Sequence, residues 1–337
     1  MAKKILGVDI GSDNLKLALV QGRQVLATVS VPMPKNMVRD GHIASGESMS
    51  EMIRDAMKAN RLRAGAAAYV IPNENVYVKN VVMPQMTADQ LVYNLPFEFR
   101  DYISGEIREY VFDYAMLTGP GRIRGRAQDE EEAPTMELLA VSAPKAEIEE
   151  VRGIMRSAGL RLAKAAPAIC AYINLIRAYE AQDGAGPDEF CILDLGYQSI
   201  RMYMFRGERH MVTRVMDTGL SALDEVLADL FSVDIHLAHT YLMTNYENCQ
   251  NRAECLEAFD GIAMELMRVL NFYRYSNPDS NIQDIWLCGG GAMIAPLREA
   301  IGSILDMQVH PASDLVPSGE EIEDCNSFVQ VIGIAID

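Results

Sequence analysis

One segment of this chain occurs twice. Residues 8–22 read VDIGSDNLKLALVQG, and residues 193–207 read LDLGYQSIRMYMFRG. An offset of 185 residues aligns Asp9 with Asp194, Gly11 with Gly196, Leu15 with Ile200, Lys16 with Arg201, and Gly22 with Gly207. Each copy consists of an extended run, a turn with an acid and a glycine, and a second extended run. A third extended run follows in both cases. Because internal repeats reflect repeated architecture, the chain is predicted to contain two similar lobes that face one another.

Composition limits the classes of function open to such a chain. Its 337 residues, 49% of them hydrophobic and 23% charged, are enough to bury a large core in two or more lobes. The net charge of −17 argues against general nucleic-acid binding, which needs a basic surface. No apolar run approaches the roughly 20 residues of a membrane span, and no signal peptide is evident. We therefore expect a cytoplasmic protein, in which the six scattered cysteines are reduced thiols.

The first 84 residues alternate extended and helical patterns. Residues 4–31 predict a three-stranded antiparallel meander with turns at the glycines. Residues 46–62 carry apolar side chains at helical spacing after a serine-rich start, which predicts a helix. Two further strands are expected at 66–72 and 75–84.

The character of the chain changes at Pro84. A helix that starts at Thr87 and is interrupted at Pro96 is followed by strands at 107–117 and 136–143 and then by another helix. This order predicts a small inserted α/β subdomain.

Residues 118–134 lie between the two predicted strands and are rich in glycine, charge and proline. This composition is typical of a solvated, mobile hairpin loop. A regulatory or partner-binding loop is the alternative interpretation.

The two Asp-x-Gly turns have the composition of a phosphate site. Glycine lets backbone N–H groups approach a phosphate, and a carboxylate beside it is the hard oxygen ligand that Mg²⁺ prefers. One such turn is ordinary hairpin chemistry, but two aligned copies could clamp a nucleoside triphosphate between the lobes. In addition, the apolar strand 285–288 runs into Gly289, Gly290 and Gly291 and then a helix, so backbone can press against a flat ligand.

The predicted nucleotide site therefore combines three segments of the chain. Asp9 and Asp194 are expected to hold Mg²⁺, directly or through water. No catalytic residue is predicted. The full predicted set is Asp9, Gly11, Ser12, Asp13, Asn14, Lys16, Asp194, Gly196, Tyr197, Gln198, Ser199, Gly289, Gly290 and Gly291.

The order of two phosphate turns and a glycine-rich loop resembles the actin and sugar-kinase superfamily. The insert resembles the characteristic subdomain of the type IV pilus assembly protein PilM family, with an acidic helix ending near Pro-Phe and a Phe-Asp-Tyr strand. Here these are Pro96–Phe97 and Phe112–Tyr114, and the family's DIGS…K pattern is carried by Asp9–Ser12 and Lys16. The closing FVQVIGIAID also resembles the family's last helix. The likeness to PilM spans essentially the whole chain.

The resemblance implies an α/β fold of two actin-like, ribonuclease-H-like lobes, with a small α/β subdomain inserted in the first lobe. It implies that residues 1–84 form the first lobe, completed by a C-terminal helix at about 326–337, and that residues 85–163 form the insert. Residues 164–325 then form the second lobe, which includes a helical subdomain at about 220–281.

The function that the resemblance implies is that of the PilM family. Its members are cytoplasmic, bind ATP between the lobes, and hold the short cytoplasmic N-terminal tail of the membrane protein PilN by the inserted subdomain. They link a type IV pilus or type II secretion-like platform to its motor. The resemblance thus implies ATP and Mg as cofactors, and a PilN-like tail and other platform and motor proteins as partners. It implies a location at the inner face of the membrane, with neither membrane insertion nor nucleic-acid binding.

Several positions near the expected nucleotide depart from the family pattern. The second turn carries Tyr197 and Ile200 where small residues and a threonine are usual. Ala166 and Ala168 stand where acids are usual, which removes a candidate for orienting an attacking water. Because phosphoryl transfer needs positioned Mg²⁺ ligands and a positioned water, we expect a scaffold with weak or no ATP hydrolysis. The alternatives are an active ATPase or kinase of the same fold and an FtsA-like, filament-forming cell-division protein.

The helical region of the second lobe offers other polar candidates. His239 and Leu242 stand where an acid and a lysine usually meet the nucleoside. His236 and His239 have the spacing of a metal pair on a helix, although a surface or core-edge pair is the ordinary interpretation. Glu265 and Arg268 are expected either to reach the nucleotide or to lie in solvent.

Overall fold

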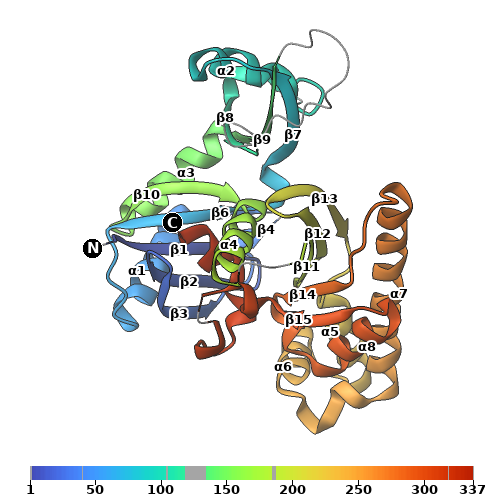
Figure 1. Ribbon diagram of the computed structural model, residues 1–337. Coiled ribbons are helices and arrows are strands. Elements are labelled where there is room, and N and C mark those ends of the chain that lie inside the picture. The colour runs from blue at the N-terminus through green and yellow to red at the C-terminus, as the bar shows by residue number, and fades with distance from the viewer. Residues whose placement is uncertain are drawn as a thin grey trace.

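The computed structural model describes residues 2–39, 41–103, 105–117, 134–183, 187–317 and 319–336. Two five-stranded sheets form the cores of two lobes, and a three-stranded sheet forms a separate subdomain above them (Figure 1). The two-lobed α/β architecture with an inserted subdomain, predicted from the sequence, is confirmed.

The first sheet has the strand order β10-β6-β1-β2-β3. Strands β1, β2 and β3 are antiparallel neighbours, which confirms the predicted meander, while β6 is parallel to both β1 and β10. The bounds are β1 (Lys4–Ile10), β2 (Asn14–Gln21), β3 (Gln24–Pro32), β6 (Ala66–Ile71) and β10 (Arg161–Pro167). A small hairpin of β4 (Val38–Arg39) and β5 (His42–Ile43) lies outside this sheet.

The second sheet repeats the first in strand order and direction. Starting from the matching edge, its order is β15-β14-β11-β12-β13. Strands β11, β12 and β13 are antiparallel neighbours, and β14 is parallel to both β11 and β15. The bounds are β11 (Glu189–Leu195), β12 (Ile200–Arg206), β13 (Arg209–Met216), β14 (Asp284–Cys288) and β15 (Gln308–Pro311). Hairpin β11–β12 therefore occupies the position of hairpin β1–β2, and the internal repeat is a repeat of structure.

Helices cover one face of the first sheet. Helix α1 (Gly46–Ala59) begins at Ser45, whose side chain accepts a hydrogen bond from the backbone N–H of Ser48. Helix α3 (Lys145–Ser157) packs against α1, and the two bury their apolar sides with Val8 and Leu17 of the sheet.

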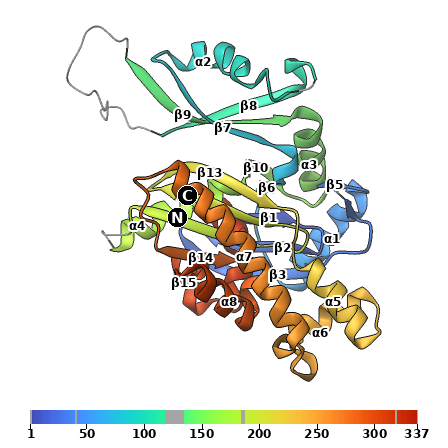
Figure 2. The same ribbon diagram turned by 90° about the vertical axis from the view of Figure 1, so that its right-hand side faces the viewer.

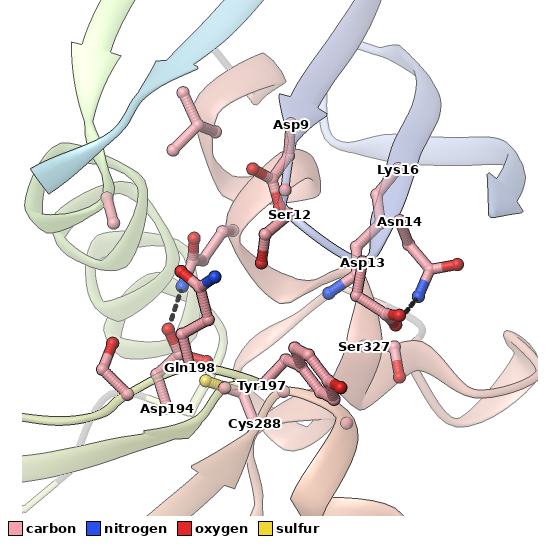
Figure 3. Close-up of a pocket in the computed structure, with 18 of the residues that line it drawn as sticks. Asp9, Ser12, Asp13, Asn14, Lys16, Asp194, Tyr197, Gln198, Cys288 and Ser327 are labelled. Carbon is pink, nitrogen blue, oxygen red and sulfur yellow. Dashed lines mark hydrogen bonds between the residues drawn. The ribbon is translucent and has the colours of Figure 1, made fainter. Parts of the chain in front are cut away.

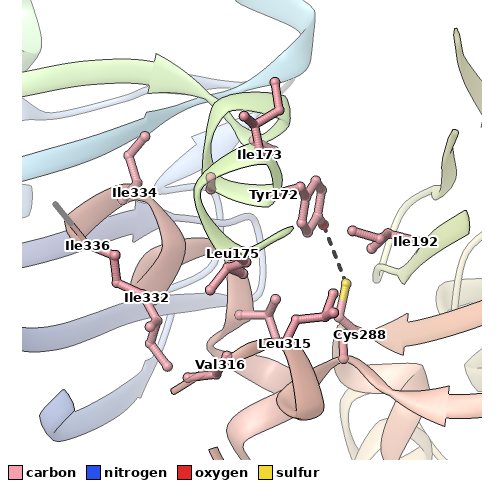
Figure 4. Packing of buried hydrophobic residues seen from close by; sticks show 14 of the residues in the cluster. Tyr172, Ile173, Leu175, Ile192, Cys288, Leu315, Val316, Ile332, Ile334 and Ile336 are labelled. Carbon is pink, nitrogen blue, oxygen red and sulfur yellow. Dashed lines mark hydrogen bonds between the residues drawn. The ribbon is translucent and has the colours of Figure 1, made fainter. Parts of the chain in front are cut away.

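A shared apolar core joins the two lobes. Helices α4 (Ala168–Asp183) and α9 (Val329–Ala335) lie between the sheets, where Leu175 and Ile332 belong to the same buried cluster as Ile192 of β11 and Val70 of β6 (Figure 4). Burial of this apolar surface stabilises one arrangement of the lobes.

The outer side of the second lobe is helical. Helices α5 (Ser221–Phe231), α6 (Ile235–Thr244) and α7 (Ala253–Ser276) follow β13, and α8 (Ala295–Leu305) follows β14. Their apolar sides form one buried cluster with the second sheet.

The insert contains a three-stranded antiparallel sheet of order β7-β9-β8. Its strands are β7 (Tyr77–Pro84), β8 (Tyr110–Met116) and β9 (Thr135–Pro144). Helix α2 (Ala88–Asn94) starts with a capping box of Thr87 and Gln90 and gives way at Pro96 to a 3-10 turn. Figure 2 shows the sheet as a layer apart from the lobes, with α2 on the side away from them.

The insert is expected to comprise residues 85–163, and the sheet pairing moves both of these bounds. Strand β7, predicted within the first lobe, pairs with β9 of the insert. In the other direction, β10 pairs with β6 and α3 packs on α1, so both belong with the first lobe. A strand pattern identifies a strand but not its partner, because pairing is decided by contacts distant in sequence. Of the predicted loop 118–134, residues 118–133 lie outside the described residues.

Two expectations from composition can be compared with the structure. Each of the six cysteines is a free thiol, and burial raises the pKa of Cys191 and of Cys325 to about 12. Among the residues that the structure describes, no helix has both the length and the apolarity needed to cross a bilayer.

Candidate functional site

The two repeated hairpins meet at one pocket of about 600 Å³. Figure 3 shows Asp9, Ser12 and Lys16 on the first hairpin facing Asp194 and Gln198 on the second. The predicted residues that line the pocket are Asp9, Gly11, Ser12, Asp13, Asn14, Lys16, Asp194, Gly196, Tyr197, Gln198, Ser199, Gly289 and Gly290. Three segments far apart in sequence are thus brought to a single site.

Gly291 is the one predicted residue that is not part of the pocket lining. A Cβ atom at this position would lie 2.7 Å from the Cβ of Leu195 and 3.1 Å from Leu220. The glycine therefore allows close packing behind the pocket.

Glycine allows the backbone to pack closely at the three turns that line the pocket. A Cβ atom at Gly196 would lie 2.7 Å from the carbonyl oxygen of Ser199, and one at Gly11 would lie 3.0 Å from that of Asn14. Gly289 has a φ of +83°, and its Cβ would come within 2.7 Å of Asp194 Oδ1. A side chain at Gly289 would therefore occupy space beside Asp194, whereas side chains at Gly11 and Gly196 would clash with the backbone of their own turns.

Each hairpin pairs its acid with a cation. Asp9 of β1 lies opposite Lys16 of β2, and Asp194 of β11 lies opposite Arg201 of β12. All four side chains line the pocket. Burial raises the pKa of Asp9, Lys16 lowers it, and the negative charge of Asp194 adds to the increase. The two carboxylates therefore interact across the junction of the lobes, an arrangement that a shared cation would stabilise.

Asp194 is held in place by a residue that the sequence analysis missed. Gln330 on α9 donates a hydrogen bond of 2.7 Å to Asp194 Oδ2 and another of 2.8 Å to the hydroxyl of Tyr172. The signal available in the sequence was a single amide side chain within the otherwise apolar closing helix, VQVIGIA. This contact orients one oxygen of Asp194 and leaves Oδ1 for a ligand.

The oxygen donors at the pocket suit Mg²⁺ bound largely through phosphate and water. Within the described residues, no group of three or more His, Cys, Asp and Glu side chains could hold a metal ion. Mg²⁺ commonly takes only one or two protein carboxylates and completes its octahedron with water and substrate phosphates. Asp9 and Asp194 meet that requirement.

A second contact network crosses between the lobes at His239 on α6. Its Nδ1 lies 2.9 Å from Oδ2 of the fully buried Asp224, and its Nε2 lies 3.9 Å from Asp13 Oδ2 in the first turn. Tyr197 packs edge-on against the imidazole with ring centroids 5.2 Å apart. Burial, together with Asp224, raises the pKa of Tyr197 to about 12. His239 is therefore part of the pocket wall, whereas His236 is exposed three residues earlier on the helix.

The protein should become less stable as pH rises past the pKa of His239. The hydrogen bond to Asp224 raises this pKa above 6.5 against the opposing effect of burial. A group whose pKa is raised by folding contributes its full stabilisation below about pH 6.5 and loses it as pH rises through the folded-state value. The measurement is the difference in unfolding free energy between wild type and His239→Gln, obtained by urea denaturation from pH 6 to 9.

The glutamine variant keeps a hydrogen-bond donor but cannot titrate, so other ionisable groups cancel from this difference. The stability advantage of wild type should shrink with rising pH. A difference that stays constant across this range would show that folding does not raise the pKa of His239.

Other residues singled out from the sequence occupy ordinary positions. Glu265 and Arg268 on α7 are not among the residues that line the pocket. Leu242 is fully buried in the second-lobe core. Ala168, the first residue of α4, does line the pocket and places a methyl group there.

Comparisons with known proteins identify related sequences and structures. The family model of type IV pilus assembly protein PilM matches residues 7–316. The solved PilM-PilN type IV pilus biogenesis complex is similar at 22% identity, with a TM-score of 0.81, over 98% of this chain and 97% of that chain. A comparison with curated proteins gave no match.

Two further solved structures share the fold. The ethanolamine utilization protein EutJ from Carboxydothermus hydrogenoformans is 15% identical, with a TM-score of 0.62, over 100% of this chain and 90% of that chain. MreB5 of Spiroplasma citri bound to ADP is 10% identical, with a TM-score of 0.53, over 98% and 94%. The predicted α/β fold of two actin-like lobes is confirmed.

Proposed function

Because the chain belongs to the type IV pilus assembly protein PilM family, we propose that it is a nucleotide-binding scaffold of a type IV pilus or type II secretion-like platform. In this role it binds ATP with Mg²⁺ between its lobes and holds the cytoplasmic tail of a PilN-like membrane protein. It acts at the inner face of the membrane, where its partners include other platform and motor proteins.

The observation that carries the nucleotide part of this proposal is the pocket between the repeated hairpins. Its volume of about 600 Å³ falls within the range of small-molecule sites. Lys16 supplies positive charge for phosphates, and Asp9 and Asp194 supply oxygens for Mg²⁺. Mg²⁺ would neutralise phosphate charge there. MreB5, which has a similar fold, was solved bound to ADP, and this also supports nucleotide binding.

The side chains around the pocket favour binding over hydrolysis. A general base must lie within hydrogen-bond reach of the attacking water and be free to accept its proton. Gln330 occupies one oxygen of Asp194, Glu74 is paired with Arg201, and Ala168 has no carboxylate to offer. These contacts support a nucleotide that stabilises one arrangement of the lobes and is hydrolysed slowly or not at all.

The insert carries the features expected of a partner surface. Val92, Tyr93 and Phe97 on α2 and the following turn are each more than half exposed. On the opposite face of the sheet, Val82 and Val111 are exposed as well, as the alternation along β7 and β8 requires. Exposed apolar and aromatic side chains gathered in one small subdomain are typical of protein interaction sites. The overall fold is similar to that of the PilM-PilN complex, which supports a PilN-like tail as the ligand.

Calorimetric titration with Mg²⁺-ATP and with a synthetic PilN cytoplasmic-tail peptide tests both parts of the proposal. Asp9→Asn should weaken Mg²⁺-ATP binding by about tenfold or more, because a charged oxygen ligand is lost. The exposed Asp55→Asn on α1 removes the same charge away from the pocket and should have no effect. Phe97→Ala should weaken peptide binding by about tenfold, whereas Phe272→Ala, equally exposed on α7, should not.

Three outcomes would contradict the proposal in different ways. Heat with peptide but none with nucleotide would leave a scaffold that binds its partner alone. Single-turnover hydrolysis that disappears in Asp9→Ala would identify a working ATPase. Sedimenting polymers or binding to anionic liposomes would favour the filament-forming alternative.

A further inference from the structure

Arg201 occupies the position in the second lobe that Lys16 occupies in the first. Lys16 lies opposite Asp9 across hairpin β1–β2, and Arg201 lies opposite Asp194 across hairpin β11–β12. Both side chains line the pocket. If the hairpins bind phosphate as a pair, the second needs a cation as the first does, and Arg201 is the residue that the symmetry provides.

The hydrogen bonding of Arg201 is incomplete. Its side chain is 17% exposed, and Nη2 donates to the carboxylate of Glu74, on the 3-10 turn Asn73–Asn75 of the first lobe. Its Nε–H is buried and has no hydrogen-bond partner among the described residues. A guanidinium has five N–H donors, and a buried donor without an acceptor costs free energy. The pocket therefore contains an arginine with capacity for a further acceptor.

The Glu74 contact can be exchanged for another anion. Glu74 is 48% exposed, so its pairing with Arg201 is partly screened by water and contributes little. Glu74 itself lines the pocket, which places the pair beside the ligand volume. A phosphate group has more charge than a carboxylate and accepts bidentate hydrogen bonds from arginine. Phosphate should therefore displace Glu74 from the guanidinium.

We propose that Arg201 is a phosphate-binding residue of this pocket and that it exchanges Glu74 for the phosphate chain of a bound nucleotide. This inference rests on the proposed nucleotide function. Arg201 then belongs to the binding site, and Glu74 acts as a competitor that occupies the arginine when phosphate is absent.

The test is titration of ATP, ADP and adenosine into the full chain with Mg²⁺. Arg201→Gln should weaken binding of ATP by roughly tenfold to a hundredfold, because charge-assisted hydrogen bonds are lost. Arg201→Lys, which keeps the charge but not the bidentate geometry, should be intermediate. Glu74→Gln should change the affinity in the opposite direction and tighten ATP binding by roughly two- to fivefold. Adenosine binding should not change in any of these variants.

Arg177 and Glu208 provide matched controls. They form an exposed ion pair of the same chemistry outside the pocket lining. Arg177→Gln and Glu208→Gln remove the same charges and should leave all three affinities unchanged. Thermal melting of each variant shows whether it is folded.

The signs of the two key variants distinguish a phosphate ligand from a latch between the lobes. If the Arg201–Glu74 pair only holds the lobes together, both variants will weaken ATP, ADP and adenosine alike, and the proposal is wrong. Unchanged ATP affinity in Arg201→Gln would overturn it as well. If wild type binds no nucleotide, the proposed nucleotide function fails and this inference fails with it. If wild type binds ATP but the Arg201 and Glu74 variants bind it with unchanged affinity, only this inference is refuted.

Discussion

Replacing Gly7 by alanine is expected to destabilise the protein by about 3 kcal/mol. A Cβ atom at this position of β1 would lie 2.0 Å from the carbonyl oxygen of Val331 and 3.0 Å from its carbonyl carbon. Both atoms belong to the backbone of α9, so the clash can be relieved only by moving the helix. Gly333 of α9 is equally constrained, since its Cβ would lie 2.5 Å from the carbonyl oxygen of Ala171. Urea denaturation of Gly7→Ala measures the loss.

Gly153→Ala is the matched control for that substitution. Gly153 lies within α3, and a Cβ atom there would have no neighbour within 4 Å. Alanine in an open helical position should stabilise the protein by about 0.5 to 1 kcal/mol. The two glycine-to-alanine changes should therefore have opposite signs. A Gly7→Ala protein as stable as wild type would mean that α9 does not pack against β1 as described.

Replacing His239 by leucine should cost about 3 kcal/mol, because it removes the imidazole partner of a buried carboxylate and leaves Asp224 only its contact with Tyr197. Asp224 is 0% exposed and has its Oδ2 2.9 Å from Nδ1 of His239. Adding Asp224→Leu to the leucine variant should restore most of the loss, since an apolar pair replaces a buried ionisable pair. A double-mutant cycle of unfolding free energies measures this coupling.

His236→Leu serves as the control on the same helix. This side chain is exposed, and substitutions at such positions usually change stability by less than about 0.5 kcal/mol. If His239→Leu were as mild as His236→Leu, Asp224 would have to be satisfied by other groups. If the double variant were no more stable than the single variant, the cost would come from lost packing instead of an unpaired charge.

Much of the local structure follows from the sequence pattern. The hairpins with turns at Gly11 and Gly196, the capping box at Thr87 and the helix break at Pro96 all occur where the residue types predict them. Each depends on residues within a few positions of one another, so local sterics and hydrogen bonding are sufficient.

The pairing of distant segments could not be obtained in this way. Nothing in the residues of β7 shows that it joins β9 instead of the first sheet, and β10 and β15 carry too little pattern to be recognised. The hydrogen-bond and ion-pair partners of the predicted acids also come from segments that are distant in the sequence. Gln330 reaches Asp194 from α9, 136 residues later in the chain, and His239 approaches Asp13 from the opposite lobe.

The repeat alone was enough to establish two equivalent hairpins, their acids and their cations, because each hairpin is closed by residues adjacent in the chain. Whether those hairpins face one another, and which side chain meets which across the gap, depends on the apolar core that α4 and α9 form between the sheets. Burial of apolar surface is not directional and leaves no short-range signature. The contact of Arg201 with Glu74 and the choice of Gln330 as the partner of Asp194 were therefore decided by the fold as a whole.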